Sequence, residues 1–376
     1  MSDDLALTVG GQKLIGWTET SVTRGIEQMP STFSVAATEG SPALSDAAAV
    51  QPGQACTVHL GPDKVITGYV DTVQSSYSAG QHVVQIAGRG KCQDLVDCSS
   101  EWPTGQISGA NALEIAQKLA APYGITATAP DGGGQTVPQF NINIGDTSAS
   151  ILELITRHAA LLYYEGTDGN LILAQAADKT AASGFVEGRN VQSATVVRSV
   201  AGRYSDYKCS YLSINESPLF IGNDGLFFGD AADPNITRNR KLYIVAEGVF
   251  GGRDLCIARV KWEAARRSGR GLQVSITCDS WRDSAGMLWT PNTLAPVSLP
   301  RLKLPQTALC IALVTYRFAL GSGRTAEVLL MPKEAFLPQP IVLQPLIPGL
   351  VSPAVAPITD IKPQTPPDLK LNAPNG

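Results

Sequence analysis

Three acidic residues lie beside tryptophans, in positions where a cell-wall hydrolase could use them. Glu101 precedes Trp102, and Asp279 and Asp283 flank Trp281. Cleavage of a glycosidic bond needs two carboxylates about 5–10 Å apart, one of them with a raised pKa. Each of these residues falls in a predicted loop, where Asp and Glu commonly cap turns. The sequence therefore predicts no catalytic residue, and a wall hydrolase ranks last among the alternatives.

The sequence lacks the residue spacing of the usual metal-binding and phosphate-binding motifs. The three histidines, His59, His82 and His158, form no i, i+4 pair, and no H-E-x-x-H motif occurs. Residues 88–91, Gly-Arg-Gly-Lys, lack the glycine frame and the Ser or Thr of a phosphate-binding loop. The seven cysteines are scattered without a C-x-x-C pair, which predicts buried free thiols. We expect no metal site and no cofactor.

One local cluster of positive charge lies on a predicted amphipathic helix over residues 254–267. Arg259, Arg266 and Arg267 lie mostly off its apolar face, and we predict that they contact a neighbouring subunit or partner. A solvated helix face and contact with DNA in a channel are the alternatives. The net charge of −4 argues against a global electrostatic attraction to nucleic acid.

A capped helix followed by a hairpin forms the clearest pair of predicted elements. Asp146 or Thr147 supplies the N-cap oxygen, and Asp168-Gly169 marks the hairpin turn. The residues of the apolar helix face are Ile151, Leu152, Leu154, Ile155 and Ala159. This unit contains no nucleophile and no ligand set, so it favours a packing role over a catalytic one.

Short strands separated by Gly, Pro and Asp turns precede and follow this central unit. Residues 56–60 and 272–278 alternate between apolar and polar, as half-buried strands do. A faint repeat joins the two regions, because residues 52–60 share a pattern with residues 291–299. These patterns predict two small antiparallel barrels or sandwiches.

We therefore predict a β-rich α+β fold in four parts. Prolines in the last part suppress helix and interior strand, while its apolar residues favour docking on a surface over an unstructured tail. Its predicted contact residues are Ile341, Leu343 and Leu346. The four parts are a barrel-like β domain (1–90), an α/β domain with the helix and hairpin (91–175), a second barrel-like β domain with one amphipathic helix (176–336), and an extended Pro-rich arm (337–376).

Charged residues make up 16% of the chain, against roughly 25% in typical soluble domains. This low fraction favours a surface covered by partner subunits, with a weakly charged monomer as the alternative. The first residues form no secretory signal, and no apolar run reaches the length of a membrane span. We expect no membrane insertion and assembly in a cytoplasm.

Several weak motifs follow one another in an order that resembles Mu-like phage baseplate hub proteins. They lie in residues 9–33, 52–71, 88–99 and 289–293, on either side of the helix and hairpin. The likeness extends over about residues 5–336, and it depends on the order and spacing of the motifs.

The resemblance implies a structural protein of a contractile tail. Hub trimers of this family adapt a sixfold tail tube to a threefold spike. The implied function is a homotrimeric baseplate hub that joins tube to spike and leaves an axial channel for DNA ejection. Implied partners are the tail spike protein, the end of the tail tube or tape measure, and other baseplate proteins, with DNA passing only transiently.

The implied location is the virion, after assembly in the host bacterial cytoplasm. The runner-up is a spike or hub component of a type VI secretion or extracellular contractile injection system. A type VI spike chain normally continues into a fused β-helix needle, whereas this chain continues into the proline arm.

Overall fold

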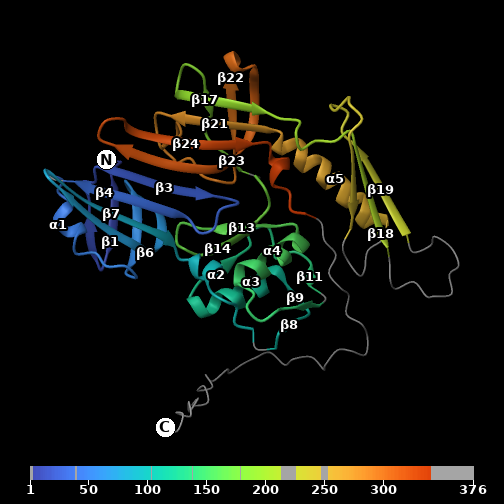
Figure 1. The fold of residues 1–376 in the computed structure, drawn as a ribbon, viewed down its shortest axis with the longest axis horizontal. Helices are drawn as coiled ribbons and strands as arrows, with labels where there is room; N and C mark the ends of the chain where they lie inside the picture. Colours follow the sequence, from blue (N-terminus) through green and yellow to red (C-terminus); the bar gives the residue numbers. More distant parts are fainter. Residues whose placement is uncertain are drawn as a thin grey trace, which may run out of the picture.

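The fold is β-rich α+β, as predicted, in a computed structural model of the chain. A 14-stranded sheet forms its main layer, with a small α/β domain on one side and a separate three-stranded sheet beside a long helix (Figure 1). The predicted arm contacts Ile341, Leu343 and Leu346 lie outside the described residues. The structure describes residues 3–38, 40–102, 104–137, 139–177, 179–212, 226–246 and 253–339.

The first β unit contributes seven strands to the large sheet. Strands β4 and β5 alternate between buried and more exposed residues, because one face of the sheet covers a core. The elements are β1 (Leu5–Val9), β2 (Gln12–Leu14), β3 (Glu19–Gly25), β4 (Thr32–Thr38), the short helix α1 (Leu44–Ala47), β5 (Ala55–Leu60), β6 (Asp63–Ser78) and β7 (Gln81–Gly90).

The α/β domain has a core of its own, built mainly by two helices and a hairpin. Asn111 and Glu114 form the predicted capping box of α3, in which each side chain accepts from the other residue's backbone N–H. The elements are α2 (Gln93–Asp97), β8 (Gln106–Ile107), β9 (Ala110–Asn111), α3 (Ala112–Ala120), η1 (Ala121–Tyr123), β10 (Ala127–Thr128), β11 (Thr136–Val137), β12 (Phe140–Asn141), α4 (Ser148–Ala159), β13 (Leu162–Glu165) and β14 (Leu171–Ala174).

The second β unit completes the large sheet and contains an insertion. The strands and short helices that belong to the unit itself are β15 (Lys179–Thr180), β16 (Phe185–Val186), β17 (Val191–Arg198), β21 (Leu272–Cys278), β22 (Thr293–Leu299), η2 (Pro300–Leu302), β23 (Leu304–Ala319), β24 (Gly323–Met331) and η3 (Lys333–Phe336). The insertion lies between β17 and β21 and consists of β18 (Asp206–Leu212), β19 (Leu226–Ala232), β20 (Lys241–Val245) and α5 (Arg253–Arg270).

The two β units repeat one strand order. The first runs β3-β4-β7-β6-β5-β1, and the second runs β17-β21-β24-β23-β22-β16. The β5–β6 ladder has a bulge at Val58/His59, and the equivalent β22–β23 ladder has one at Val297/Leu299. The units differ at one end, because β1 is antiparallel to β5 whereas β16 is parallel to β22. The faint repeat in the sequence therefore corresponds to a repeat in the structure.

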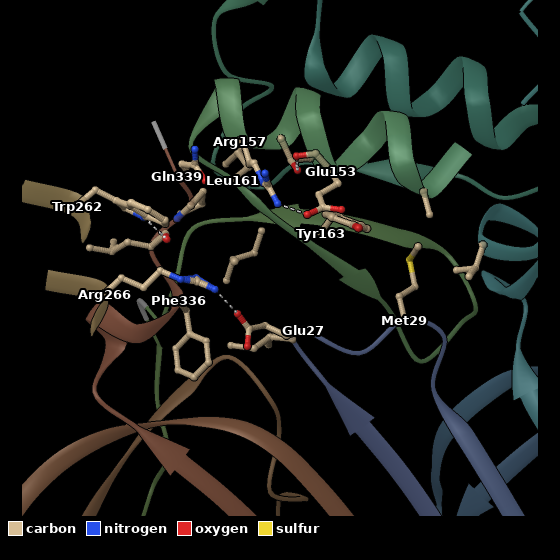
Figure 2. A pocket seen from close by; sticks show the side chains of 17 residues that line it. Glu27, Met29, Glu153, Arg157, Leu161, Tyr163, Trp262, Arg266, Phe336 and Gln339 are labelled. Atoms are coloured by element: carbon tan, nitrogen blue, oxygen red, sulfur yellow. Dashed lines mark hydrogen bonds and ion pairs between the residues drawn. The ribbon is translucent and has the colours of Figure 1, made fainter. Parts of the chain in front are cut away.

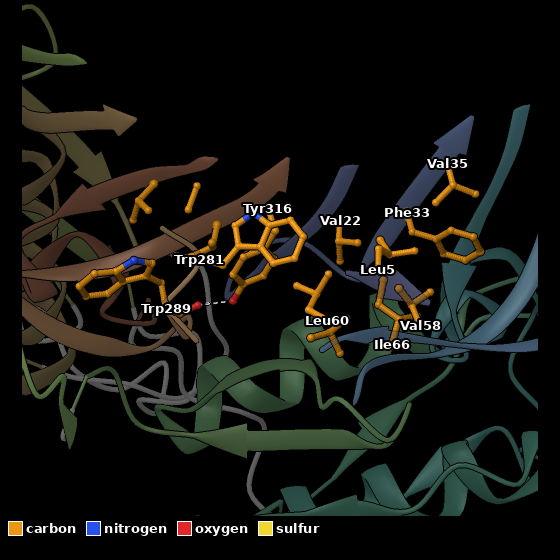
Figure 3. Packing of buried hydrophobic residues seen from close by; sticks show 14 of the residues in the cluster. Leu5, Val22, Phe33, Val35, Val58, Leu60, Ile66, Trp281, Trp289 and Tyr316 are labelled. Carbon is orange, nitrogen blue, oxygen red and sulfur yellow. Dashed lines mark hydrogen bonds between the residues drawn. The ribbon is translucent and has the colours of Figure 1, made fainter. Parts of the chain in front are cut away.

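One continuous hydrophobic core joins the two units. Trp281 and Tyr316 of the second unit belong to the same buried cluster as Val22, Leu60 and Ile66 of the first (Figure 3). The sheet also runs through the junction, because β23 pairs with β3 along seven consecutive positions. Neither unit closes its core by itself.

Three local details differ from the sequence-based expectation. Leu154 is 39% exposed, because it faces away from the packed side of α4. The hairpin turn is longer than Asp168-Gly169 alone, since Gly166 N–H donates to the Asn170 carbonyl across a five-residue loop. Helix α5 continues through Ser268 and Gly269 to Arg270 and does not break at residue 268.

Candidate assembly surfaces

A buried glutamate connects the α/β domain to the first β unit. Glu165, at the end of β13, is only 3% exposed. One carboxylate oxygen accepts from the Ser31 backbone N–H and the other from the Cys92 backbone N–H, each at 2.8 Å. Ser31 lies just before β4 and Cys92 just before α2, so one side chain fixes two chain segments. We call this arrangement the Glu165 joint.

The surroundings of the joint are shaped to this carboxylate. A Cβ atom on Gly90 would lie 1.9 Å from a Glu165 carboxylate oxygen, so a side chain there is excluded. Burial raises the pKa of Glu165, while the two backbone donors and the nearby Arg24 charge oppose that rise. Sequence reasoning did not select Glu165. Its one local signal is a charged residue that ends an otherwise apolar strand.

A cleft of about 530 Å³ lies where the α/β domain, the end of β3 and helix α5 meet (Figure 2). Its walls contain both apolar and polar side chains. The two acidic side chains are each paired with an arginine: Glu27 with Arg266 at 3.4 Å, and Glu153 with Arg157. The last described residues of the chain, 337–339, also line it. The predicted C-terminal arm therefore begins at this cleft.

The arginines of α5 pair within their own chain. Arg266 and Arg270 both reach Glu27, which lies directly after β3. Arg267 pairs with Glu263 at 2.5 Å and donates to the Gly202 carbonyl at 2.9 Å. These contacts connect the inserted helix to the first β unit and to the segment between β17 and β18.

Trp262 lies within this arginine cluster. The Arg259 guanidinium is 4.8 Å from the centre of its ring, and that of Arg266 is 5.6 Å away. Its indole N–H donates to the Leu337 carbonyl at 2.6 Å, which holds the start of the C-terminal segment (Figure 2). Arg259, Arg266 and Arg267 thus have structural contacts within the chain, and their predicted contact with a partner stays a prediction.

The three-stranded sheet of the insertion (β18, β19 and β20) has an open face with exposed apolar side chains. Helix α5 covers the other face, where Tyr207, Cys209 and Val260 are buried. On the open face Phe228, Tyr243 and Val245 are 56%, 72% and 74% exposed. Ser210 lies between Phe228 and Val245, and Lys208 lies beside Tyr243, so this face mixes apolar and polar side chains. Sequence analysis did not find this face, because the strands carry too few local signals.

Of the acidic residues considered for hydrolysis, Glu101 lies in the α/β domain, apart from Asp279 and Asp283. Asp283 accepts from the backbone N–H groups of Ala285 and Met287 at 2.9 and 3.0 Å, as a turn-capping residue does. Glu101 and Asp279 are exposed and lie in different parts of the fold. Within the described ranges, no group of three or more His, Cys, Asp and Glu side chains is placed to hold a metal ion.

Six of the seven cysteines are buried free thiols, as predicted, and Cys98 is half-buried. Burial raises the pKa of Cys56 and of Cys310, each to about 12, which keeps these thiols protonated and unreactive. Among the helices that the structure describes, none is long and apolar enough to cross a membrane.

Comparison with known proteins matches three successive parts of the chain to one kind of protein. Residues 4–90 match the family described as Mu phage baseplate assembly protein GpP-like, N-terminal, and residues 92–175 match Baseplate hub protein gp44-like, second domain. Residues 253–339 match Mu phage baseplate assembly protein GpP, fourth domain. The chain belongs to the Mu-like baseplate hub proteins.

Relatives of this hub protein align along nearly all of its length. Baseplate hub protein gp44 of Escherichia phage Mu is 28% identical over 348 residues, which cover 90% of each chain. The 43 kDa tail protein of prophage MuSo2 from Shewanella oneidensis is 29% identical, with a TM-score of 0.79, over 90% of this chain and all of that one. The protein is therefore a baseplate hub protein of a Mu-like phage tail.

A type VI secretion system component from E. coli shares the fold at much greater sequence distance. It is 11% identical, with a TM-score of 0.56, over 87% of this hub protein and 76% of that chain. At this identity the likeness concerns the fold alone.

Proposed function

We propose that this hub protein forms a homotrimeric ring that joins the tail tube to the central spike and leaves an axial channel for DNA ejection. The observation that supports this proposal is the repeat of β units. Two units with the same strand order in each chain give six similar units in a trimer. Such a ring would match a sixfold tube on one side and a threefold spike on the other.

The proposed mechanism is assembly and release, with no bond-making step and no cofactor. Obligate contacts of this kind bury on the order of thousands of Å², and cyclic symmetry closes the ring. The proposed partners are the spike protein, the end of the tube or tape measure, and other baseplate proteins. The protein would assemble in the host cytoplasm and remain in the virion until the spike is released.

We also propose the four-part division of the chain as its functional organisation. Residues 1–90 and 176–336 would build the ring, residues 91–175 would flank it, and residues 337–376 would form the docking arm. The arm would leave the folded part of the chain at the cleft beside Trp262, because residues 337–339 line that cleft. Its proposed contact residues are Ile341, Leu343 and Leu346. Deleting residues 340–376 should then preserve folding and weaken assembly.

The runner-up function is a hub or spike component of a type VI or extracellular injection system. The E. coli type VI component shares this fold. We prefer the phage hub because the relatives with higher identity and near-complete coverage are phage baseplate and tail proteins.

Light scattering of the purified full-length chain tests the ring directly. We expect a trimer, reached at high concentration or on addition of the spike protein. Electron microscopy of the same sample should show a ring with a central opening. A monomer at every concentration, with and without spike protein, would overturn the proposal.

A further inference from the structure

Among the strand edges of the large sheet that have no strand partner within the described part of the chain, two have counterparts that are paired inside the chain. The first is the outer edge of β17 beyond Val191, where the strand pairs with β21 alone and ends the sheet (Figure 1). The second belongs to residues 72–78 of β6, which pair with β7 on one side and extend past the end of β5 on the other. We call these the free edges. Exposed edges offer unpaired backbone groups to another chain.

Inside the chain, the counterparts of both free edges are paired with each other. The repeat makes β17 equivalent to β3 and β6 equivalent to β23. Strand β3 pairs with the second half of β23, from Leu313 opposite Gly25 to Ala319 opposite Glu19. This intrachain junction is what joins the two β units into one sheet.

We propose that β17 of one subunit pairs antiparallel with residues 72–78 of β6 in a second copy of the chain. Each contact between subunits would then reproduce the intrachain junction. A contact between two different edges is head-to-tail, and it generates a closed ring when the rotation permits. The inference rests on the proposed trimer, in which three such contacts would alternate with three intrachain junctions.

The two ladders fix the register of this pairing. Bulges at Val70/Thr72 and Ile311/Leu313 align Thr72 with Leu313. The same alignment extends across the neighbouring strands, which makes β7 equivalent to β24 and β4 equivalent to β21. At the outermost strands it aligns Val22 of β3 with Val196 of β17. The intrachain register then transfers to the free edges. The predicted opposing pairs are Gln74 with Val197, Ser75 with Val196, and Tyr77 with Ala194.

Along β6, two side chains have counterparts of the same kind on β23, whereas Ser75 corresponds to Tyr316. Val73 corresponds to Val314, and Tyr77 corresponds to Phe318, by the same alignment. Val314 is fully buried, whereas Val73 is half-buried. Tyr77 is 86% exposed. The second copy would cover these side chains.

On the β17 side the contrast is the same. Val22 is fully buried in the intrachain junction, whereas its counterpart Val196 is only partly buried against the core. Val197, on the opposite face of β17, is 48% exposed. The free edge of β17 therefore lacks the cover that β23 gives to β3.

Engineered disulfides test the register in the full-length chain. Gln74→Cys and Val197→Cys in one chain place thiols at directly opposing positions, where Cα atoms lie about 4.5–5.5 Å apart, within disulfide range. The matched control is Gln74→Cys with Thr195→Cys, displaced by two residues on the same face to about 7–8 Å. After mild oxidation, the first variant should shift from the monomer band to a covalent trimer on a non-reducing gel. The control should stay at the monomer band.

Light scattering of the unmodified chain separates this inference from the proposed function. If the chain is trimeric and the Gln74/Val197 pair does not cross-link, the strand pairing is wrong while the trimeric hub stands. Cross-linked species larger than trimers would show that the contact forms an open filament, and this result would also overturn the proposed strand pairing. A chain that is monomeric throughout removes both proposals.

A charge on the free edge gives a second readout. Tyr77→Asp changes a side chain that is exposed in the single chain, so folding should be unaffected. Opposite Ala194 of the second copy, the carboxylate would lose hydration without gaining a partner. We expect the trimer of the Tyr77→Asp variant to dissociate at a higher protein concentration than the wild-type trimer does. An unchanged trimer population would contradict the pairing.

Discussion

At the scale of single residues, Glu165 is a buried side chain that connects the α/β domain to the first β unit. Replacing it with Gln leaves one oxygen to accept a single backbone N–H, and it turns an amide N–H₂ group toward the other donor. Leaving a buried donor unsatisfied costs about 1–3 kcal/mol. We expect Glu165→Gln to lower the melting temperature measured by calorimetry.

The same substitution at an exposed glutamate provides the control. Glu101 is exposed, so Glu101→Gln should leave the melting temperature of the chain unchanged. Equal melting of the Glu165→Gln variant and the wild type would show that the Glu165 joint adds little to stability.

A second residue-scale effect concerns pH. Burial, together with the charges of Lys64 and Lys13, lowers the pKa of His59 from its ordinary value of 6.5. Below pH 6.5 the unfolded chain therefore binds more protons at this site than the folded chain, so acidification reduces stability until the pH passes the folded pKa. We expect His59→Gln to lose less stability than the wild type between about pH 7 and about pH 5.

The measurement is the melting temperature of both proteins across that range. His59 is partly exposed, so the expected difference is small, and its sign is what matters. A wild-type protein that loses no more stability on acidification than the variant would refute the expectation.

At the scale of elements, the contact between α5 and η3 depends on a glycine. A Cβ atom on Gly269 would lie 2.5 Å from the Ala335 backbone nitrogen. Gly→Ala in an exposed helix stabilises by about 1 kcal/mol. We expect Gly269→Ala to destabilise instead, because the helix and η3 must separate, and thermal unfolding would show this.

Gly321→Ala is the matched control, since no atom lies within 4 Å of the Cβ position at Gly321. If both variants melt at the wild-type temperature, α5 and η3 accommodate the added methyl group without losing stability, and the packing argument fails. The position also explains why the helix continues past residue 268: Gly269 serves close packing there and does not end the helix.

At the scale of the whole molecule, the parts of the chain differ in how far they depend on one another. The α/β domain buries its own core, formed by residues between Cys92 and Leu173. The first β unit shares its core with the second. It also depends on Arg282, which pairs with Asp3 at 2.9 Å and with Asp63 at 2.6 Å.

We therefore expect a fragment of residues 92–175 to unfold cooperatively by itself. A fragment of residues 1–90 should be unstable or aggregate, because it would expose the core side of β3 and a strand edge that β23 normally covers. Circular dichroism during heating distinguishes the two fragments. Cooperative melting of fragment 1–90 at the temperature of the full chain would contradict this dependence.

Much of the local structure could be predicted from the sequence. Thr147 is the N-cap of α4, and its hydroxyl accepts from the Ser150 N–H at 3.2 Å. The strand predicted over residues 272–278 is β21 with those bounds. Such features depend on hydrogen bonds and apolar periods within a few residues, which neighbouring letters of the sequence encode. The repeat and the family likeness were also readable, because they depend on order along the chain.

The contacts that organise the molecule were decided only by the tertiary structure. Glu165 lies 134 residues from Ser31, and Arg270 lies 243 residues from Glu27, so no local pattern predicts either pair. The single core of the two β units and the free edges likewise follow from which strands become neighbours. That choice depends on the burial of apolar surface summed over the whole chain, a quantity that no segment specifies alone.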